Sequence, residues 1–379
     1  MILVLRALVG FCLIAAPYID AEVSLQLWGW AANAPLADGA ALLSLLFAGA
    51  LWLWRRPRWD VLGVVEALGW GMLWAVGVAN AGFGADLPGE GPDALHTLVR
   101  KPIFLCLAWR YGFAEVVRAC LVRGQPTFVM RALAFACVVC ALVLCVSSAQ
   151  RIVAGEALWW RAIEGLTNNH KTLAVFLAPT LPLLSGPVMA VVLGAIVLAW
   201  SKASWVTALF CVGWTTLRGR TRAWVLGAGT LLALMALSVL PYLARSPEQI
   251  DSLRSRMSLN RRAWDMAMAH PWLGYGAGTN VRYEVSTFPD YRVNGVDAHG
   301  VIAKLVSEFG IVGFAAWSVA TMAIGLRLWR RAPAGQGLDH AILGAFLALH
   351  LNLLTSTEAF SQTHWAVLGL LCGLSARRR

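Results

Sequence analysis

Apolar runs of membrane-spanning length recur along this 379-residue chain and are separated by short polar segments. A helix needs about 20 mostly apolar residues to cross a bilayer, and backbone polar groups inside the bilayer must be satisfied internally. The pattern therefore predicts an all-α polytopic membrane protein with about 12 transmembrane helices. The runs lie at roughly 2–19, 40–54, 61–83, 98–117, 127–149, 167–184, 187–200, 203–217, 223–243, 301–326, 338–355 and 363–376.

One long polar segment, residues 244–299, interrupts this pattern. It divides the chain into helices 1–9 within residues 1–243, a long loop, and helices 10–12 within residues 300–379. Inside the loop, Ser255–His270 is predicted to form an amphipathic helix, because apolar side chains recur there at spacings of seven and four. Pro271 would end that helix.

Composition and charge set the class of protein and its orientation. The chain is 59% hydrophobic and 13% charged, whereas soluble domains carry about 25% charged residues. The net charge of +11 does not indicate a nucleic-acid partner, because Lys and Arg gather in the cytoplasmic loops of membrane proteins. With both termini cytoplasmic, one side receives Arg55, Arg56, Arg58, Arg118, Arg123, Arg218, Arg220, Arg222, Arg327, Arg330, Arg331 and Arg377–Arg379.

This orientation places residues 244–299 outside the cell, which in a bacterium means the periplasmic face of the inner membrane or the outer face of a single membrane. Several basic and titratable residues outside the long loop also fall at the periplasmic ends of predicted spans. Charge beside a bilayer is costly, and residues of this kind are therefore candidates for function. They include Arg100, His170, Lys171 and Lys202.

Spacing in the loop and in the segment after it carries a family pattern. An arginine stands fifteen residues before a Pro-x-x-Gly-x-Gly turn, and a histidine follows, with a Glu-x-Gly-x-x-Gly run after it. The residues are Arg256, Pro271, Gly274, Gly276, His299, Glu308, Gly310 and Gly313. In these residues, and across about 166–313, the chain resembles the O-antigen ligase and O-antigen polymerase superfamily. It departs from the pattern where Lys202 replaces the usual Arg and where Gly300 follows the histidine.

The resemblance implies a GT-C-like membrane fold with short helices in the periplasmic loop, and an enzyme that transfers a glycan. The implied donor is an undecaprenyl-diphosphate-linked glycan, the implied acceptor is lipid A–core oligosaccharide or another glycan, and membrane lipids surround the protein. O-antigen ligase is the leading hypothesis for the activity. A polysaccharide polymerase and a protein O-oligosaccharyltransferase share the same donor, and a transporter of lipid-linked anions is the alternative from a different class.

The residue types suit this chemistry without the resemblance. A diphosphate leaving group gains negative charge that guanidinium groups stabilise. An acceptor hydroxyl needs a base that is free near neutral pH, and an imidazole, with an ordinary pKa of about 6.5, meets that need. We therefore expect His299 and Arg256 to be catalytic. The expected diphosphate contacts are Lys202, Arg262, Arg100, Lys171 and His170.

Neither a metal nor another cofactor is expected. No Asp-x-Asp sequence occurs in the chain, and the periplasmic loops lack paired carboxylates at ligand spacing. Cationic side chains would take the place of a divalent ion at the diphosphate.

Overall fold

The computed structural model describes residues 2–16, 22–27, 30–55, 60–83, 98–122, 126–153, 170–198, 201–217, 229, 247–279, 300–332, 337–355 and 361–376. The elements are α1 (Ile2–Ala15), β1 (Glu22–Leu27), β2 (Trp30–Pro35), α2 (Leu36–Arg55), α3 (Val61–Phe83), η1 (Val99–Phe113), α5 (Ala114–Val122), α6 (Pro126–Val153), α7 (His170–Thr180), η2 (Leu181–Leu183), α8 (Gly186–Leu198), α9 (Lys202–Thr216), α11 (Pro247–Ala269), α13 (Val301–Arg331), α14 (Gly337–Thr355) and α15 (Gln362–Ser375).

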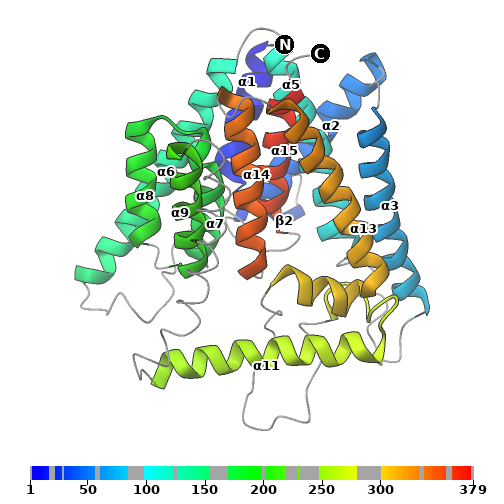
Figure 1. Cartoon of the computed structure of the whole chain (residues 1–379). Helices are drawn as coiled ribbons and strands as arrows, with labels where there is room; N and C mark the ends of the chain where they lie inside the picture. Colours follow the sequence, from blue (N-terminus) through cyan, green and yellow to red (C-terminus); the bar gives the residue numbers. More distant parts are fainter. Residues whose placement is uncertain are drawn as a thin grey trace.

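The helices form a bundle, and α11 lies across one end of it (Figure 1). Helix α1 begins, and α15 ends, at the opposite end of the bundle. Every predicted span coincides with a helix except the one at 223–243, most of which lies outside the described residues. The proline-rich pair between 167 and 200 is resolved as α7, the short 3-10 helix η2, and α8.

Several helices have the length and composition of membrane spans. Among the residues that the structure describes, four helices meet both criteria: Val61–Asn80, Thr127–Val146, Val301–Arg331 and Gly337–Leu354. Shorter apolar helices accompany them in the bundle. These helices support an integral, polytopic membrane protein. The count of about 12 spans, the side on which each terminus lies and the GT-C-like fold stay predictions.

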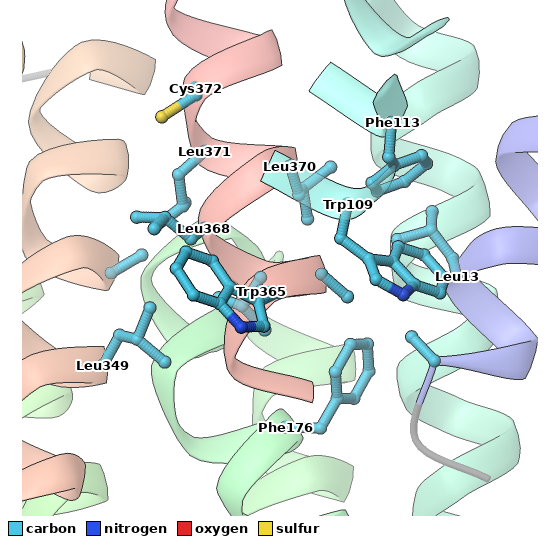
Figure 2. Close-up of a cluster of buried hydrophobic side chains, with 14 of the residues drawn as sticks. Leu13, Trp109, Phe113, Phe176, Leu349, Trp365, Leu368, Leu370, Leu371 and Cys372 are labelled. Carbon is cyan, nitrogen blue, oxygen red and sulfur yellow. The ribbon is translucent and has the colours of Figure 1, made fainter. Parts of the chain in front are cut away.

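Buried apolar side chains from both halves of the sequence meet in one core. Figure 2 shows Leu13 of α1, Trp109 and Phe113 of η1, Phe176 of α7 and Trp365 of α15 around a common centre. All five side chains are at most 2% exposed. Trp365 also makes an edge-to-face contact with a tryptophan of α3, with ring centroids 5.0 Å apart. Such aromatic packing fixes α15 between helices that lie far away in sequence.

A buried ion-pair network joins α3, η1 and α13 at the end of the bundle opposite α11. Glu66 is 1% exposed, and it accepts bonds from Arg110 at 2.7 Å and from Arg327 at 3.0 Å. Arg327 also pairs with Asp60 at 3.4 Å. Two carboxylates and two guanidinium groups balance in charge, as burial demands.

This network corrects one expectation. Arg327 was expected in a cytoplasmic loop, but α13 continues to Arg331, and Arg327 bonds to the buried carboxylate of Glu66.

Two further features differ from the expectations. The loop before α2 contains an antiparallel hairpin of β1 and β2, which adds a small sheet to an otherwise helical protein. In the described part of the long loop, residues 247–279, α11 is a helix of 23 residues, longer than the short helices expected there. Helix α11 starts eight residues before the predicted Ser255, because nothing between Pro247 and Ala269 breaks a helix. Proline itself is favoured in the first turn.

Candidate functional site

The backbone of α13 is sharply kinked at Gly310. This glycine has φ 64° and ψ −171°, a conformation that is essentially restricted to glycine. The kink separates a buried first segment, Val301–Phe309, from the longer part of the helix. In Figure 1 the first segment lies at an angle to the rest of α13, close to the end where α11 lies.

A glycine-rich turn follows α11 directly. Gly274, Gly276 and Gly278 all have positive φ, at 74°, 109° and 78°, where residues with a Cβ are disfavoured. The predicted turn at Pro271–Gly278 is therefore present, and α11 ends just before Pro271, as expected.

The turn and the kink bond to each other through their backbones. In a continuous helix, the N–H groups of Ile311 and Val312 would donate to the carbonyls of Ser307 and Glu308. Here the backbone of the turn replaces both partners: it donates to the two carbonyls and accepts from the two N–H groups. The N–H groups of Tyr275 and Gly276 donate to Ser307 and Glu308, at 3.0 and 2.8 Å, and the other two donate to the carbonyls of Pro271 and Trp272, at 2.8 and 3.2 Å.

We call this contact between Pro271–Gly276 and Ser307–Val312 the turn–kink junction. A Cβ on Gly274 would lie 2.5 Å from the carbonyl carbon of Glu308, and a Cβ on Gly310 would lie 2.5 Å from the amide nitrogen of Leu273. No side chain fits between the two backbones. One close approach of the two backbones thus accounts for glycine at position 274 and at position 310.

Asn80, near the end of α3, completes the junction. Its side-chain Nδ2 donates to the carbonyl of Leu273 in the turn and, at 3.3 Å, to the carbonyl of Glu308 in the kink. Asn80 is 6% exposed. This residue was not among the predicted site residues. The sequence feature that could have indicated it is a polar amide inside the apolar run at 61–83. Such groups are rare in membrane spans, where they form hydrogen bonds to other helices.

Helix α11 presents one face to the bundle. Leu259, Ala263 and Met266 are at most 2% exposed, and α11 packs against α13. Arg256 stands in the same helix, seven residues before Ala263.

The two adjacent arginines of α11 differ in their exposure to solvent. Arg262 is buried, with 6% exposed, whereas Arg261 is exposed. Of these two, Arg262 was the one expected to contact the diphosphate. Its burial at the bundle side of α11 distinguishes it from the solvated arginine beside it.

Arg100 lies in the first turn of η1. The residue at the start of that turn, Leu98, packs on α3, where a Cβ on Gly77 would lie 2.9 Å from Leu98 Cδ2. Gly77 is about one turn before Asn80. Position 100 therefore lies at the same end of the bundle as the turn–kink junction.

His170 and Lys171 begin α7, and Lys202 begins α9. These two helices run in the same direction. Near the end of α9, Cys211 donates to the carbonyl of Ala178 at 3.3 Å, close to the end of α7. The beginnings of α7 and α9 therefore lie at a common end of the bundle.

That end is the one at which α13 begins. Trp214, late in α9, donates to the carbonyl of His340 at the start of α14, at 3.1 Å. The other end of α14 meets the start of α13, because a Cβ on Gly300 would lie 2.9 Å from the carbonyl oxygen of Leu354. Helices α7, α9 and α13 thus begin together, opposite the buried ion-pair network.

His299 itself lies outside the described residues. Gly300, directly after it, precedes the first residue of α13 and has φ 108°. One turn into α13 is Lys304, a cation that is only 6% exposed and that the sequence analysis did not single out. Position 304 adds a buried positive charge within five residues of the expected base.

The shared feature of these positions is a helix N-terminus. Arg100, His170, Lys171 and Lys202 all stand in the first turn of their helices. A helix N-terminus carries a partial positive charge and attracts anions, whereas a cation there is unfavourable. Basic residues gathered at several such ends would be stabilised by a shared anion.

The sequence of this region matches a known family. Residues 187–318 match the family model described as O-antigen ligase. We refer to residues 187–318, which are similar to that family, as the O-antigen ligase domain. Members of the family are O-antigen ligase/polymerase-type transferases of lipid-linked glycans. No curated protein matches the chain at a significant level.

The O-antigen ligase domain runs from α8 into α13 and contains α9, α11 and both halves of the turn–kink junction. Of the candidate residues, it includes Lys202, Arg256, Arg262 and His299. The remaining candidates, Arg100, His170 and Lys171, precede it in sequence. Asn80, which bonds to both halves of the junction, also lies outside the domain. The match confirms the resemblance over residues 187–318, while the roles of individual residues stay predictions.

Metal binding has no obvious ligand set in the part of the chain that the structure describes. No group of three His, Cys, Asp or Glu side chains there could hold an ion. All eight cysteines fall within that part, and none of them forms a disulfide. The metal-independent reaction nevertheless stays a prediction, which an activity measurement must test.

Proposed function

We propose that the protein is an inverting, metal-independent glycosyltransferase. It moves O-antigen glycan from undecaprenyl diphosphate to lipid A–core oligosaccharide at the periplasmic face of the bacterial inner membrane. The observation that carries the proposal is the gathering of basic positions at one end of the bundle, beside α11. The O-antigen ligase domain supplies the chemical class.

The donor diphosphate would bind at this end of the bundle. Arg262 is buried at the bundle side of α11, Arg256 stands in the same helix, and Lys202 and Arg100 stand in the first turns of α9 and η1. His170 and Lys171 would add contacts at the start of α7. Each cation offsets part of the diphosphate charge, and burial strengthens that attraction because water is excluded.

Transfer would proceed by one direct displacement. The oxygen of the acceptor hydroxyl attacks the anomeric carbon of the donor sugar, and the bond from that carbon to the diphosphate oxygen breaks. His299 takes the hydroxyl proton, and the leaving diphosphate keeps the bonding electrons. Attack from the face opposite the leaving group inverts the anomeric centre.

A reconstituted reaction tests the proposed activity. The purified protein in lipid nanodiscs would be given a polyprenyl-diphosphate-linked glycan and lipid A–core, and the products resolved by electrophoresis and mass spectrometry. We expect glycan on lipid A–core with inverted linkage. Retained anomeric configuration would contradict the single displacement.

The acceptor decides among the related activities. A longer polyprenyl-linked chain, formed from two donor molecules, would instead identify a polymerase, and transfer to a peptide would identify a protein O-oligosaccharyltransferase. Movement of the donor across a vesicle without transfer would identify a transporter. In a deletion strain, we expect rough lipopolysaccharide with accumulated long polyprenyl-linked chains, whereas core carrying one repeat unit would contradict the ligase assignment.

A further inference from the structure

We infer that Asn80 of α3 is a positioning residue, which fixes the arginine-bearing helix α11 relative to the start of α13. The inference rests on the proposed function only where it concerns catalysis. Its structural part follows from the two hydrogen bonds that Asn80 donates to opposite halves of the turn–kink junction.

The turn–kink junction connects the chain segments that carry the two expected catalytic positions. Its first half follows one position in sequence, and its second half follows the other. Arg256 lies fifteen residues before Pro271, at which the junction begins, and His299 lies nine residues before Glu308, in its second half. Any sliding of the turn along the kink would therefore move α11 against the beginning of α13. The distance between the diphosphate contacts and the base would change with it.

The backbone hydrogen bonds of the junction join the turn only to α13. Asn80 connects both to α3, which packs along α13. One turn earlier, Gly77 contacts the residue that precedes η1. The end of α3 thus holds the turn, the kink and the beginning of η1, where Arg100 lies, in one arrangement.

An asparagine suits this position for a chemical reason. Its side-chain NH₂ group has two donor hydrogens, and the two acceptors belong to segments 193 and 228 residues away. An aspartate of the same shape has no donor when ionised and would repel both carbonyl oxygens. Alanine removes the bonds without adding charge. Comparison of the two substitutions separates lost bonding from added repulsion.

The position of α11 can be measured without any activity. Spin labels on Met268→Cys in α11 and Ile302→Cys in α13 would occupy exposed sites, since these side chains are 72% and 45% exposed. Of the native cysteines, only Cys145 is not buried, and Cys145→Ser would remove it. We expect a narrow distance distribution by double electron–electron resonance with Asn80, and a broader or shifted one with Asn80→Ala.

Kinetics then test the catalytic consequence. With Asn80→Ala and Asn80→Asp we expect kcat to fall by about 10- to 100-fold, because a misplacement of about 1 Å has effects of this size. The KM for the donor should change less than kcat. Asn260→Ala is the matched control, since it removes an exposed amide from α11 itself, and it should leave both constants unchanged.

The outcomes are distinguishable. An unchanged distance distribution in Asn80→Ala would overturn the inference, whatever the enzyme does. A changed distribution with unchanged kcat per folded molecule would overturn the catalytic part. If the wild-type protein transfers no glycan, the proposed function fails, while the distance measurement still decides whether Asn80 positions α11.

Discussion

Substitution of Gly274 by alanine tests the turn–kink junction more sharply than any other single change. Gly274 has φ 74°, and an added methyl group would lie 2.5 Å from the carbonyl carbon of Glu308 and 2.6 Å from the amide nitrogens of Phe309 and Gly310. These are all backbone atoms, which cannot rotate away as a flexible side chain could. The turn must therefore separate from the kink.

The expected cost has two parts. A left-handed backbone costs a residue with a Cβ about 1–2 kcal/mol. Separation also weakens the bonds from Tyr275 and Gly276 to Ser307 and Glu308, at about 0.5–1.5 kcal/mol for each bond. The total is about 2–5 kcal/mol. Gly337 is the matched control, because it has φ 83° and nothing within 4 Å of an added Cβ, so alanine there carries only the backbone cost.

Thermal unfolding in detergent and glycan transfer would be measured for both variants. We expect Gly274→Ala to lower the melting temperature more than Gly337→Ala does. It should also reduce kcat by about 100-fold, since α11 is displaced from the start of α13. Equal melting temperatures and equal activities in the two variants would refute the close approach as the reason for glycine at position 274.

Three other predictions concern charge. Glu66→Ala leaves Arg110 and Arg327 without their shared buried carboxylate and should destabilise the protein by about 3–5 kcal/mol; an unchanged melting temperature would contradict this. Arg262→Ala should raise the KM for the donor, whereas Arg261→Ala, at an exposed position, should not; equal effects would count against Arg262 as a diphosphate contact. Transfer should persist in excess EDTA, and activity that is lost and then restored by Mg²⁺ would disprove metal independence.

The bundle could be predicted well from sequence because the bilayer imposes a simple rule. A segment that must satisfy its own backbone in hydrocarbon becomes a helix, and the apolar runs therefore coincide with helices wherever the structure describes them, whereas α11 is a helix in the polar segment. The ends of helices were less predictable. Helix α13 extends past residue 326 because Glu66, far away in sequence, supplies a buried partner for Arg327.

The site was predictable in its residue types but not in its construction. The glycines at 274, 276 and 310 were recognised from the resemblance to the family pattern, and their meeting depends on contacts between segments that sequence periodicity does not report. Asn80 was missed for the same reason, since its acceptors lie 193 and 228 residues away. Arg261 and Arg262 are adjacent in sequence, and only the packing of α11 shows which one is buried.

The central claim is that this end of the bundle transfers glycan from a lipid diphosphate with His299 as the base. The most direct test is the single-turnover rate of transfer to lipid A–core by His299→Ala, with binding of the polyprenyl-diphosphate donor measured in the same preparation. We predict that donor binding is retained while transfer falls by about 100- to 10,000-fold, the range for loss of a general base. Transfer at the wild-type rate by correctly folded His299→Ala protein would contradict the account.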